Sequence, residues 1–140
     1  MELLTTTSSA SRRAGACIIV GVYENGKIGA GAADVDSASK GAISKLMRLG
    51  DISGKPGSSL LLSDVPGVRA KRVLVIGLGK ISKYGISQFR RAVATAATQL
   101  KGSKIRDAVS YLSLEEVSDT DVYYRARYTI ETIGNVLYSF

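Results

Sequence analysis

The order in which two hydrophobic periodicities alternate along the chain constrains its fold more than any other feature. A nearly continuous apolar run at Ala16–Tyr23 is typical of a strand that is covered on both faces, and Arg72–Ile76 is likewise predicted to be a buried strand. A further strand is predicted at Asp107–Leu112. Elsewhere, apolar residues recur at three- and four-residue spacing, as in amphipathic helices. This alternation predicts one α/β domain over the 140 residues, with a mainly parallel or mixed central sheet and helices on both faces.

Capping residues set the limits of the predicted helices. The first is expected over about Asp34–Leu49, with Asp34 as its N-cap and Gly50 as its left-handed end. The second is expected from Ser87, as cap, to about Lys101. Its inward face is predicted to consist of Phe89, Ala92, Val93, Ala96 and Leu100.

Glycine, proline and asparagine mark the turns. Asn25-Gly26 is a strong hairpin signal and predicts that the chain returns through Ile28. The other short elements are a strand at Leu3 and Leu4 followed by a loop, a loop at Gly54–Gly57, a strand at Ser59–Leu62, a turn at Asp64–Gly67 and a last helix from Asp119 or Thr120.

The composition excludes several classes of catalytic site. The chain has no histidine, which removes Ser-His-Asp and Cys-His nucleophilic sites and zinc sites with imidazole ligands. Its single cysteine, Cys17, is predicted to be a small core residue, and the lack of disulfides suits a reducing, cytoplasmic location. We find neither a run near the roughly 20 apolar residues of a membrane span nor a secretory signal.

The positive charge is concentrated in one stretch of the chain. The formal net charge is +7, yet the segment from Val65 to Arg106 holds ten basic residues and no acid, which leaves nine bases and twelve acids elsewhere. A solvated face, or a face that meets an acidic partner surface, is the favoured interpretation, and phosphate contact is the alternative. The predicted contact residues are Arg90, Arg91, Lys101, Lys104 and Arg106.

A glycine turn follows the strand at Arg72–Ile76. Gly77, Gly79 and Lys80 form a weak candidate phosphate loop, because backbone amides of a glycine turn and a lysine can hold a phosphate. The spacing matches neither the phosphate-loop pattern nor the dinucleotide fingerprint. A tight turn is therefore the favoured interpretation.

Four carboxylates lie around the start of the predicted last helix. They are Glu115, Glu116, Asp119 and Asp121. Acids near a helix N-terminus favour capping and solvation, which we prefer to a divalent-metal cluster. Asp34 and Asp36 are two residues apart on a predicted helix and are expected to point to different sides.

Taken together, these segments resemble the N-terminal domain of the leucyl aminopeptidase (cytosol aminopeptidase) family, in particular its bacterial members. The resemblance covers nearly the whole chain in one order. It rests on the segments Ala16–Val22, Gly41–Gly50, Gly54–Gly57, Leu60–Leu62, Val65-Pro66, Arg72–Lys80 and Glu131–Phe140.

The resemblance implies a three-layer α/β/α, macro-domain-like fold for residues 1–140 and no catalytic role for them. Enzymes of the family remove N-terminal amino acids from peptides with two divalent metal ions (zinc, manganese or magnesium) in a C-terminal catalytic domain, and they form hexamers. Their signature Asn-Thr-Asp-Ala-Glu-Gly-Arg does not occur here, so no catalytic or metal-binding residue is carried over. The apolar end Leu137–Phe140 is expected to be covered by a following part of the protein.

The resemblance also implies the partners. They are the protein's own catalytic domain, further copies in a homo-hexamer and, for the longer protein, the peptide substrate; a membrane is not among them. Some bacterial members bind DNA, which is a first alternative role for the basic stretch. Binding of an ADP-ribose-like ligand through Gly77–Lys80, by analogy with macro domains, is a second.

Overall fold

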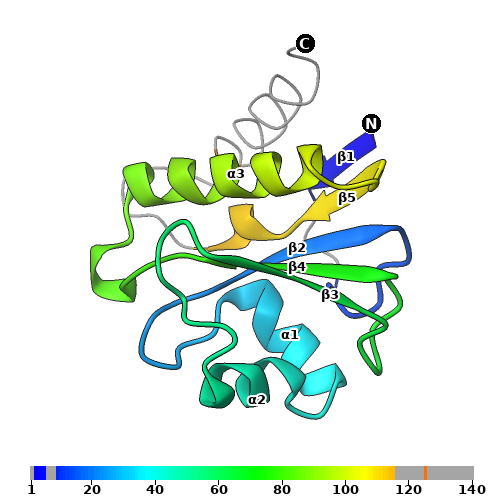
Figure 1. The fold of residues 1–140 in the computed structure, drawn as a ribbon, viewed down its shortest axis with the longest axis horizontal. Helices are drawn as coiled ribbons and strands as arrows, with labels where there is room; N and C mark the ends of the chain where they lie inside the picture. Colours follow the sequence, from blue (N-terminus) through cyan, green and yellow to red (C-terminus); the bar gives the residue numbers. More distant parts are fainter. Residues whose placement is uncertain (1, 6–8, 116–124, 126–140) are drawn as a thin grey trace.

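A mixed five-stranded sheet with the strand order β1-β5-β2-β4-β3 runs through the middle of the computed structural model, which describes residues 2–5, 9–115 and 125 (Figure 1). β1, β5, β2 and β4 are parallel, and β3 pairs antiparallel with β4 at one edge. The elements are β1 (Glu2–Thr5), β2 (Cys17–Val22), α1 (Ala30–Ala38), α2 (Ala42–Leu49), β3 (Ser59–Ser63), β4 (Arg72–Gly77), the 3-10 helix η1 (Ile81–Lys83), α3 (Ile86–Lys101), β5 (Asp107–Ser110) and the 3-10 helix η2 (Leu112–Leu114).

Helices cover both faces of this sheet, as predicted. α3 lies on one face, and α1 and α2 lie on the other (Figure 1). The predicted α/β class and three-layer arrangement are therefore confirmed. The predicted last helix lies outside the described residues.

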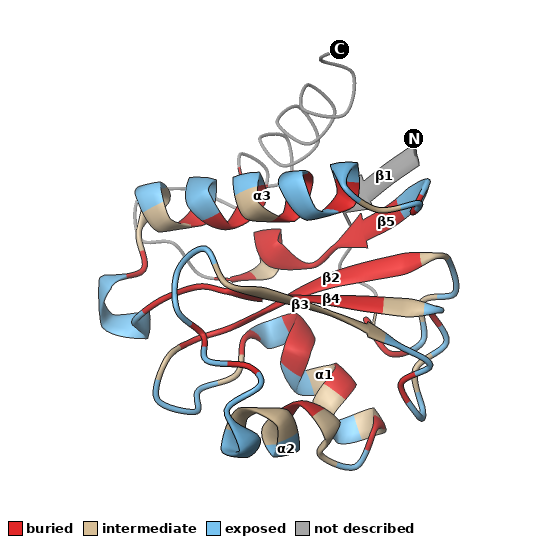
Figure 2. Ribbon diagram, viewed as in Figure 1, coloured by how far each residue is buried: buried red, intermediate tan, exposed pale blue. Residues whose placement is uncertain are grey.

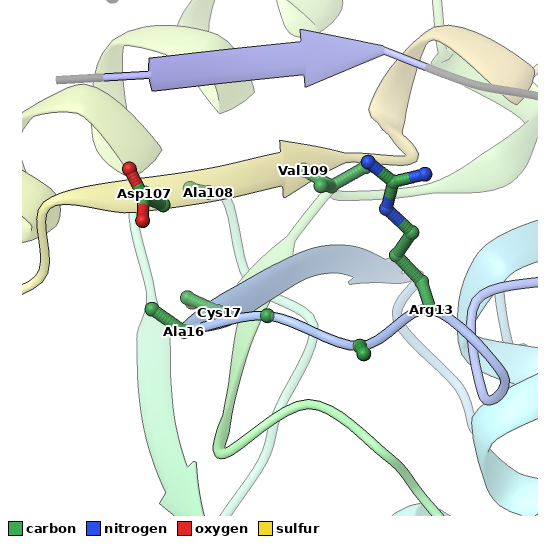
Figure 3. Close-up of a pocket in the computed structure, with 8 residues that line it drawn as sticks. Arg13, Ala16, Cys17, Asp107, Ala108 and Val109 are labelled. Atoms are coloured by element: carbon green, nitrogen blue, oxygen red, sulfur yellow. The ribbon is translucent and has the colours of Figure 1, made fainter.

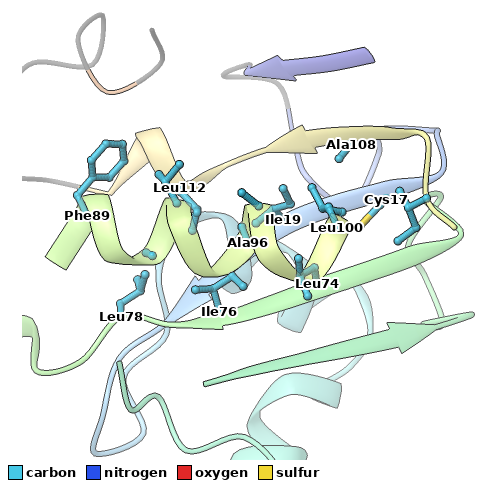
Figure 4. Packing of buried hydrophobic residues seen from close by; sticks show 14 of the residues in the cluster. Cys17, Ile19, Leu74, Ile76, Leu78, Phe89, Ala96, Leu100, Ala108 and Leu112 are labelled. Atoms are coloured by element: carbon cyan, nitrogen blue, oxygen red, sulfur yellow. The ribbon is translucent and has the colours of Figure 1, made fainter. Parts of the chain in front are cut away.

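Alternate residues of the central strands feed two hydrophobic clusters. In β2, Ile19 packs toward α3 while Ile18 and Val20 pack toward α1 and α2. The five residues predicted for the inward face of α3 are all buried in the first cluster (Figures 2 and 4). β2 itself is buried along its whole length, which is why its sequence is continuously apolar.

The predicted helix Asp34–Leu49 is two helices, so this prediction was wrong in its limits. The chain reverses at Lys40 (φ 58°) and Gly41 (φ 91°), both in the left-handed region, and α2 starts immediately afterwards. The side chain of Asp36 bridges the break, because its carboxylate accepts hydrogen bonds from the Ser44 amide (2.8 Å) and hydroxyl (2.6 Å). Gly50 ends α2 in the left-handed conformation, as predicted.

Asp34 is not an N-cap but lies inside α1. Its carboxylate accepts hydrogen bonds from the Ser9 hydroxyl and the Ser11 amide, both at 2.7 Å. Burial acts to raise the pKa of Asp34, but these bonds and the Arg12 charge outweigh it and lower the pKa. Asp34 therefore ties the segment before β2 to α1, while Asp36 points to α2, so the two acids do point to different sides.

The start of α3 also differs from the prediction. Gly85, not Ser87, is the N-cap, and its amide donates to Oε1 of Gln88 at 3.0 Å. The helix therefore begins two residues before the position that a cap at Ser87 would have set. Its end at Lys101, followed by Gly102, agrees with the prediction.

The hairpin predicted at Asn25-Gly26 is confirmed. Both residues have positive φ (64° and 78°), as the two central residues of a type I′ turn do. The Tyr23 amide donates to the Lys27 carbonyl at 2.8 Å, and Val22 forms an antiparallel bridge with Ile28. This turn directs the chain from the end of β2 into α1.

Candidate functional site

The glycine turn after β4 uses its amides inside the fold. The amides of Gly77, Leu78 and Gly79 donate to the carbonyls of residues 58, 22 and 54 at 2.9, 2.8 and 2.8 Å. A Cβ on Gly77 would meet the Lys55 carbonyl and the Ser58 hydroxyl, so this turn is packed tightly against the preceding loop. The favoured interpretation as a tight turn therefore agrees with the structure. Phosphate binding here stays a prediction, and none of these three amides is available for it.

The five predicted contact residues are exposed, but they do not form one continuous surface. Arg90 and Arg91 lie in the first turns of α3, whereas Lys101 is its last residue. At about 1.5 Å of rise per residue, Arg90 and Lys101 are about 16 Å apart along the helix axis. The exposed residues between Arg91 and Lys101 are Ala94, Thr98 and Gln99, which carry no charge. The five predicted contact residues therefore form two separate groups: Arg90 and Arg91 near the start of α3, and Lys101, Lys104 and Arg106 at or beyond its end.

One of these groups is enlarged by residues from elsewhere in the chain. β2, β4 and β5 are parallel, so their first residues lie at the same edge of the sheet, which we call the starting edge. Basic residues precede or begin each of these strands. They are Arg12, Arg13, Arg69, Lys71, Arg72, Lys101, Lys104 and Arg106.

The sequence carries a signal for this group. Arg12 and Arg13 lie outside the acid-free stretch and were not among the predicted contact residues. A parallel sheet was predicted, however, and in such a sheet the residues before each strand share an edge. Asp64 and Asp107 lie at the same edge, so its charge is predominantly but not wholly positive.

A cavity of about 180 Å³ opens at the starting edge between β2 and β5. These strands pair only through Ile18–Val109 and Ile19–Ser110, so they diverge toward their first residues. Arg13 and Asp107 lie on the rim, and the backbone around Cys17 forms part of the wall (Figure 3).

Cys17 does not make this cavity reactive. Its side chain is buried, and burial raises the pKa of its thiol to about 11. The thiol therefore stays protonated at neutral pH, and the nucleophilic form is the thiolate. The prediction that Cys17 is a small core residue is confirmed.

A buried carboxylate lies at the opposite end of the sheet. Glu115 follows η2 and is 4% exposed. It accepts hydrogen bonds from the Tyr23 hydroxyl (2.8 Å) and from the Ala30 amide at the start of α1 (2.7 Å). A helix N-terminus favours an anion, and here the chain's own carboxylate occupies that position.

Two further side chains complete this cluster. Tyr84 packs edge-on against Tyr23, with ring centroids 5.4 Å apart, and its buried hydroxyl has no hydrogen-bond partner in the described part of the chain. Arg125 is also 4% exposed, and its Nε donates to the Ser113 carbonyl at 2.9 Å. We call Tyr23, Tyr84, Glu115 and Arg125 the Glu115 cluster.

Burial dominates the electrostatics of this cluster. Burial raises the pKa of Glu115 above its ordinary value, and its hydrogen bonds and the Arg125 charge offset only part of this effect. Burial, together with the Glu115 charge, also raises the pKa of Tyr84. The Tyr23 hydroxyl and the Ala30 amide both donate to this carboxylate, so we assign it to fixing the start of α1.

The predicted carboxylate group near Glu115 is resolved only in part. Glu115 is buried and accepts the Ala30 amide at the start of α1, so the predicted solvation is wrong for this residue. Glu116, Asp119 and Asp121 lie outside the described residues. Among the residues that the structure describes, no three His, Cys, Asp or Glu side chains are grouped as metal ligands would be.

The raised pKa of Glu115 predicts a pH dependence of stability. An acid with a raised folded-state pKa binds more protons in the folded than in the unfolded state, so its contribution to stability falls as pH rises. The fall is expected to begin near the ordinary value of 4.5 and to end above the raised pKa. Chemical denaturation between pH 4 and 8 should therefore show wild type losing stability relative to Glu115→Gln. A constant difference across this range would contradict the prediction.

None of the helices in the described ranges is long and apolar enough to cross a membrane.

A family model and two curated relatives both point to cytosol aminopeptidases. The family model for the N-terminal domain of the cytosol aminopeptidase family matches residues 19–140. The probable cytosol aminopeptidases of Halorhodospira halophila and Shewanella sediminis are 39% and 38% identical over 140 residues. In both cases all of this chain is covered but only 28% of the relative, so the chain spans little more than a quarter of their length.

Solved structures support the fold. A mutant of tomato leucine aminopeptidase superposes with a TM-score of 0.69 at 21% identity, covering 99% of this chain and 28% of that one. The macrodomain of Mycobacterium tuberculosis DarG gives 0.66 at 13% identity, covering 94% and 91%. The predicted macro-domain-like architecture is thus confirmed.

Proposed function

Since this chain belongs to the cytosol aminopeptidase family, as its N-terminal domain, we propose that it is the assembly and regulatory part of a metal-dependent aminopeptidase. The longer enzyme would release N-terminal amino acids from peptides in the cytoplasm. The observation that carries this proposal is the match of residues 19–140 to the N-terminal domain alone. The relatives continue for more than twice the length of this chain beyond it, which leaves room for a catalytic part.

The described residues do not fit the metal ions that such an enzyme would use. They hold no group of three potential ligands, and the buried carboxylate Glu115 is already bound by Tyr23 and the start of α1. We therefore place the two divalent ions, whether zinc, manganese or magnesium, in the catalytic part. No step of the reaction is assigned to this chain.

The proposed partners are the catalytic part and further copies in a hexamer. Arg90, Arg91, Lys101, Lys104 and Arg106 are exposed and fit contact with acidic surfaces of these partners.

A chimera tests this role. The corresponding N-terminal part of the Halorhodospira halophila relative is replaced by residues 1–140, and release of leucine from a chromogenic substrate and particle mass are measured. The intact relative and a version that lacks the N-terminal part are the controls. We expect the chimera to retain the mass and most of the activity of the intact relative. A chimera that is no better than the truncated version would contradict the proposed role.

Nucleic-acid binding is a second candidate function, favoured by the eight basic residues at the starting edge. Because phosphate contacts release counterions, affinity for duplex DNA should fall steeply with salt. Charge reversal of Lys104 and Arg106 should weaken binding irrespective of sequence, whereas reversal of Lys45 on α2 should not. Fluorescence anisotropy at 20–200 mM salt measures both effects. No binding at 20 mM salt would remove this candidate. The ADP-ribose alternative has no comparable observation in its favour, since Glu115 occupies the start of α1.

A further inference from the structure

The outer edge of β3 is an open sheet edge. β3 is the last strand in the order, and only β4 pairs with it among the described residues. Its three leucines are half-buried (Figure 2): Leu61 packs against the cluster under α3, and Leu60 and Leu62 pack against the cluster on the other face. Ser59–Ser63 contains neither a charged residue nor a proline, which natural edge strands commonly use against further pairing.

The pairing register shows which backbone groups face outward. The Gly77 amide donates to the Ser58 carbonyl and the Asp64 amide to the Lys71 carbonyl, so even-numbered residues of this segment bond toward β4. Hydrogen-bonded and non-hydrogen-bonded positions alternate in antiparallel pairs. The amides and carbonyls of Ser59, Leu61 and Ser63 therefore point away from the sheet.

The sequence of this edge reads the same in both directions. Ser59–Ser63 is Ser-Leu-Leu-Leu-Ser, and the only prolines of the chain, Pro56 and Pro66, lie five residues to either side of Leu61. An antiparallel copy centred on Leu61 would place Leu61 opposite itself and Ser59 opposite Ser63. All three positions are outward-facing ones, so the donors and acceptors of the two edges match.

We propose that β3 is a self-association edge, at which a second copy of this chain adds its own β3 antiparallel across a twofold axis. The two five-stranded sheets then form one continuous sheet of ten strands. On one face, Leu60 and Leu62 lie beside the Leu62 and Leu60 of the second copy, and Leu61 meets its counterpart on the other. A self-complementary patch of this kind is what a twofold interface requires.

The strength and salt dependence of this contact follow from its size and charge. Five paired residues bury less than the roughly 1,000 Å² that a stable interface needs, so the dimer of this chain alone is expected to be weak. Two copies of net charge +7 repel each other, and salt screens that repulsion. Self-association should therefore strengthen with salt, whereas binding to DNA weakens. The contact does not depend on the aminopeptidase role, and either can fail without the other.

Disulfide trapping tests the geometry directly. In a hydrogen-bonded antiparallel pair the Cα atoms are about 5.5 Å apart, which suits a disulfide. We expect Leu61→Cys to form a covalent dimer under mild oxidation at least tenfold faster than Leu49→Cys, a control at an exposed position on α2. The native Cys17 is buried and does not compete. Equal rates for the two variants would overturn the proposal.

A charge pair at the same position tests the twofold symmetry. Leu61→Lys and Leu61→Glu should each be monomeric by sedimentation at high protein concentration, since like charges oppose each other on the axis. An equimolar mixture of the two should restore dimers, and circular dichroism verifies that each variant is folded. Wild type that stays monomeric, or a mixture that does not associate, would overturn the proposal. The edge would then be left for a strand of different sequence.

Discussion

Replacing Glu115 with alanine is expected to lower the free energy of unfolding by about 3–5 kcal/mol, because it breaks a buried, hydrogen-bonded charge cluster. The substitution leaves the Tyr23 hydroxyl and the Ala30 amide without the acceptor that they now share, and it removes the charge interaction between Glu115 and the buried Arg125. The raised pKa of Glu115 is compatible with this loss. Burial disfavours the charged form of Glu115. Removing the side chain is nevertheless destabilising, because its buried hydrogen-bond donors lose their acceptor.

Two variants control for this prediction. Asp51→Ala removes an exposed carboxylate and should change the free energy of unfolding by no more than about 0.5 kcal/mol. Glu115→Gln keeps the size and one acceptor, so its loss should be intermediate. Urea denaturation at pH 7 measures all three. If Glu115→Ala is as stable as Asp51→Ala, the cluster does not hold the start of α1 in place.

Gly54→Ala is expected to be the second severe change, with a loss of about 2–5 kcal/mol from left-handed strain and overpacking together. Gly54 has a φ of 77°, and a Cβ there would meet the Tyr23 carbonyl and come within 2.7 Å of the Glu24 nitrogen. Both contacts are with backbone, which cannot move aside as the end of a side chain can. The Gly54 carbonyl also accepts the Gly79 amide, so the glycine turn after β4 would be displaced as well.

Gly50 provides a matched control for this substitution. Its φ of 83° is nearly the same, but nothing lies within 4 Å of the position of its Cβ. Gly50→Ala should therefore cost only the conformational part, about 1–2 kcal/mol. Thermal and urea denaturation of the two variants separate the cost of the left-handed backbone, which both share, from the cost of steric overlap, which only Gly54→Ala has. Equal losses would show that the loop at residues 54–57 is not packed against the end of β2.

The strands and the layered arrangement could be predicted from the sequence. Strands that are buried on both faces consist of apolar runs, and these runs can be recognised in the sequence alone. It was less informative about helix limits. α1 begins at Ala30 among small residues, where a Cβ on Gly29 would meet the Gly21 carbonyl, a contact that arises only in the folded chain. The break at Lys40 and Gly41 was hidden because the apolar spacing continues across it.

The Glu115 cluster and the grouping of the basic residues depend even more on tertiary structure than the helix limits do. Glu115 contacts residues that are 85 and 92 positions away in sequence, and no local pattern marks it as the cap of α1. The acid-free stretch is visible in the sequence, but the fold places Arg90 and Arg91 near the start of α3 and Lys101, Lys104 and Arg106 at or beyond its end. In contrast, the basic group at the starting edge could have been predicted, because parallel strands bring their preceding residues together.

The claim that this chain supplies no catalytic centre of its own is tested most directly by an aminopeptidase assay on the purified 140-residue chain. Leucine p-nitroanilide is supplied with Mn²⁺, Zn²⁺ or Mg²⁺, and release is followed across the chromatographic peak of the protein. We expect no release above that of the metal ion alone, with any of the three metals. Metal-dependent release that rises and falls with the protein across that peak would contradict it.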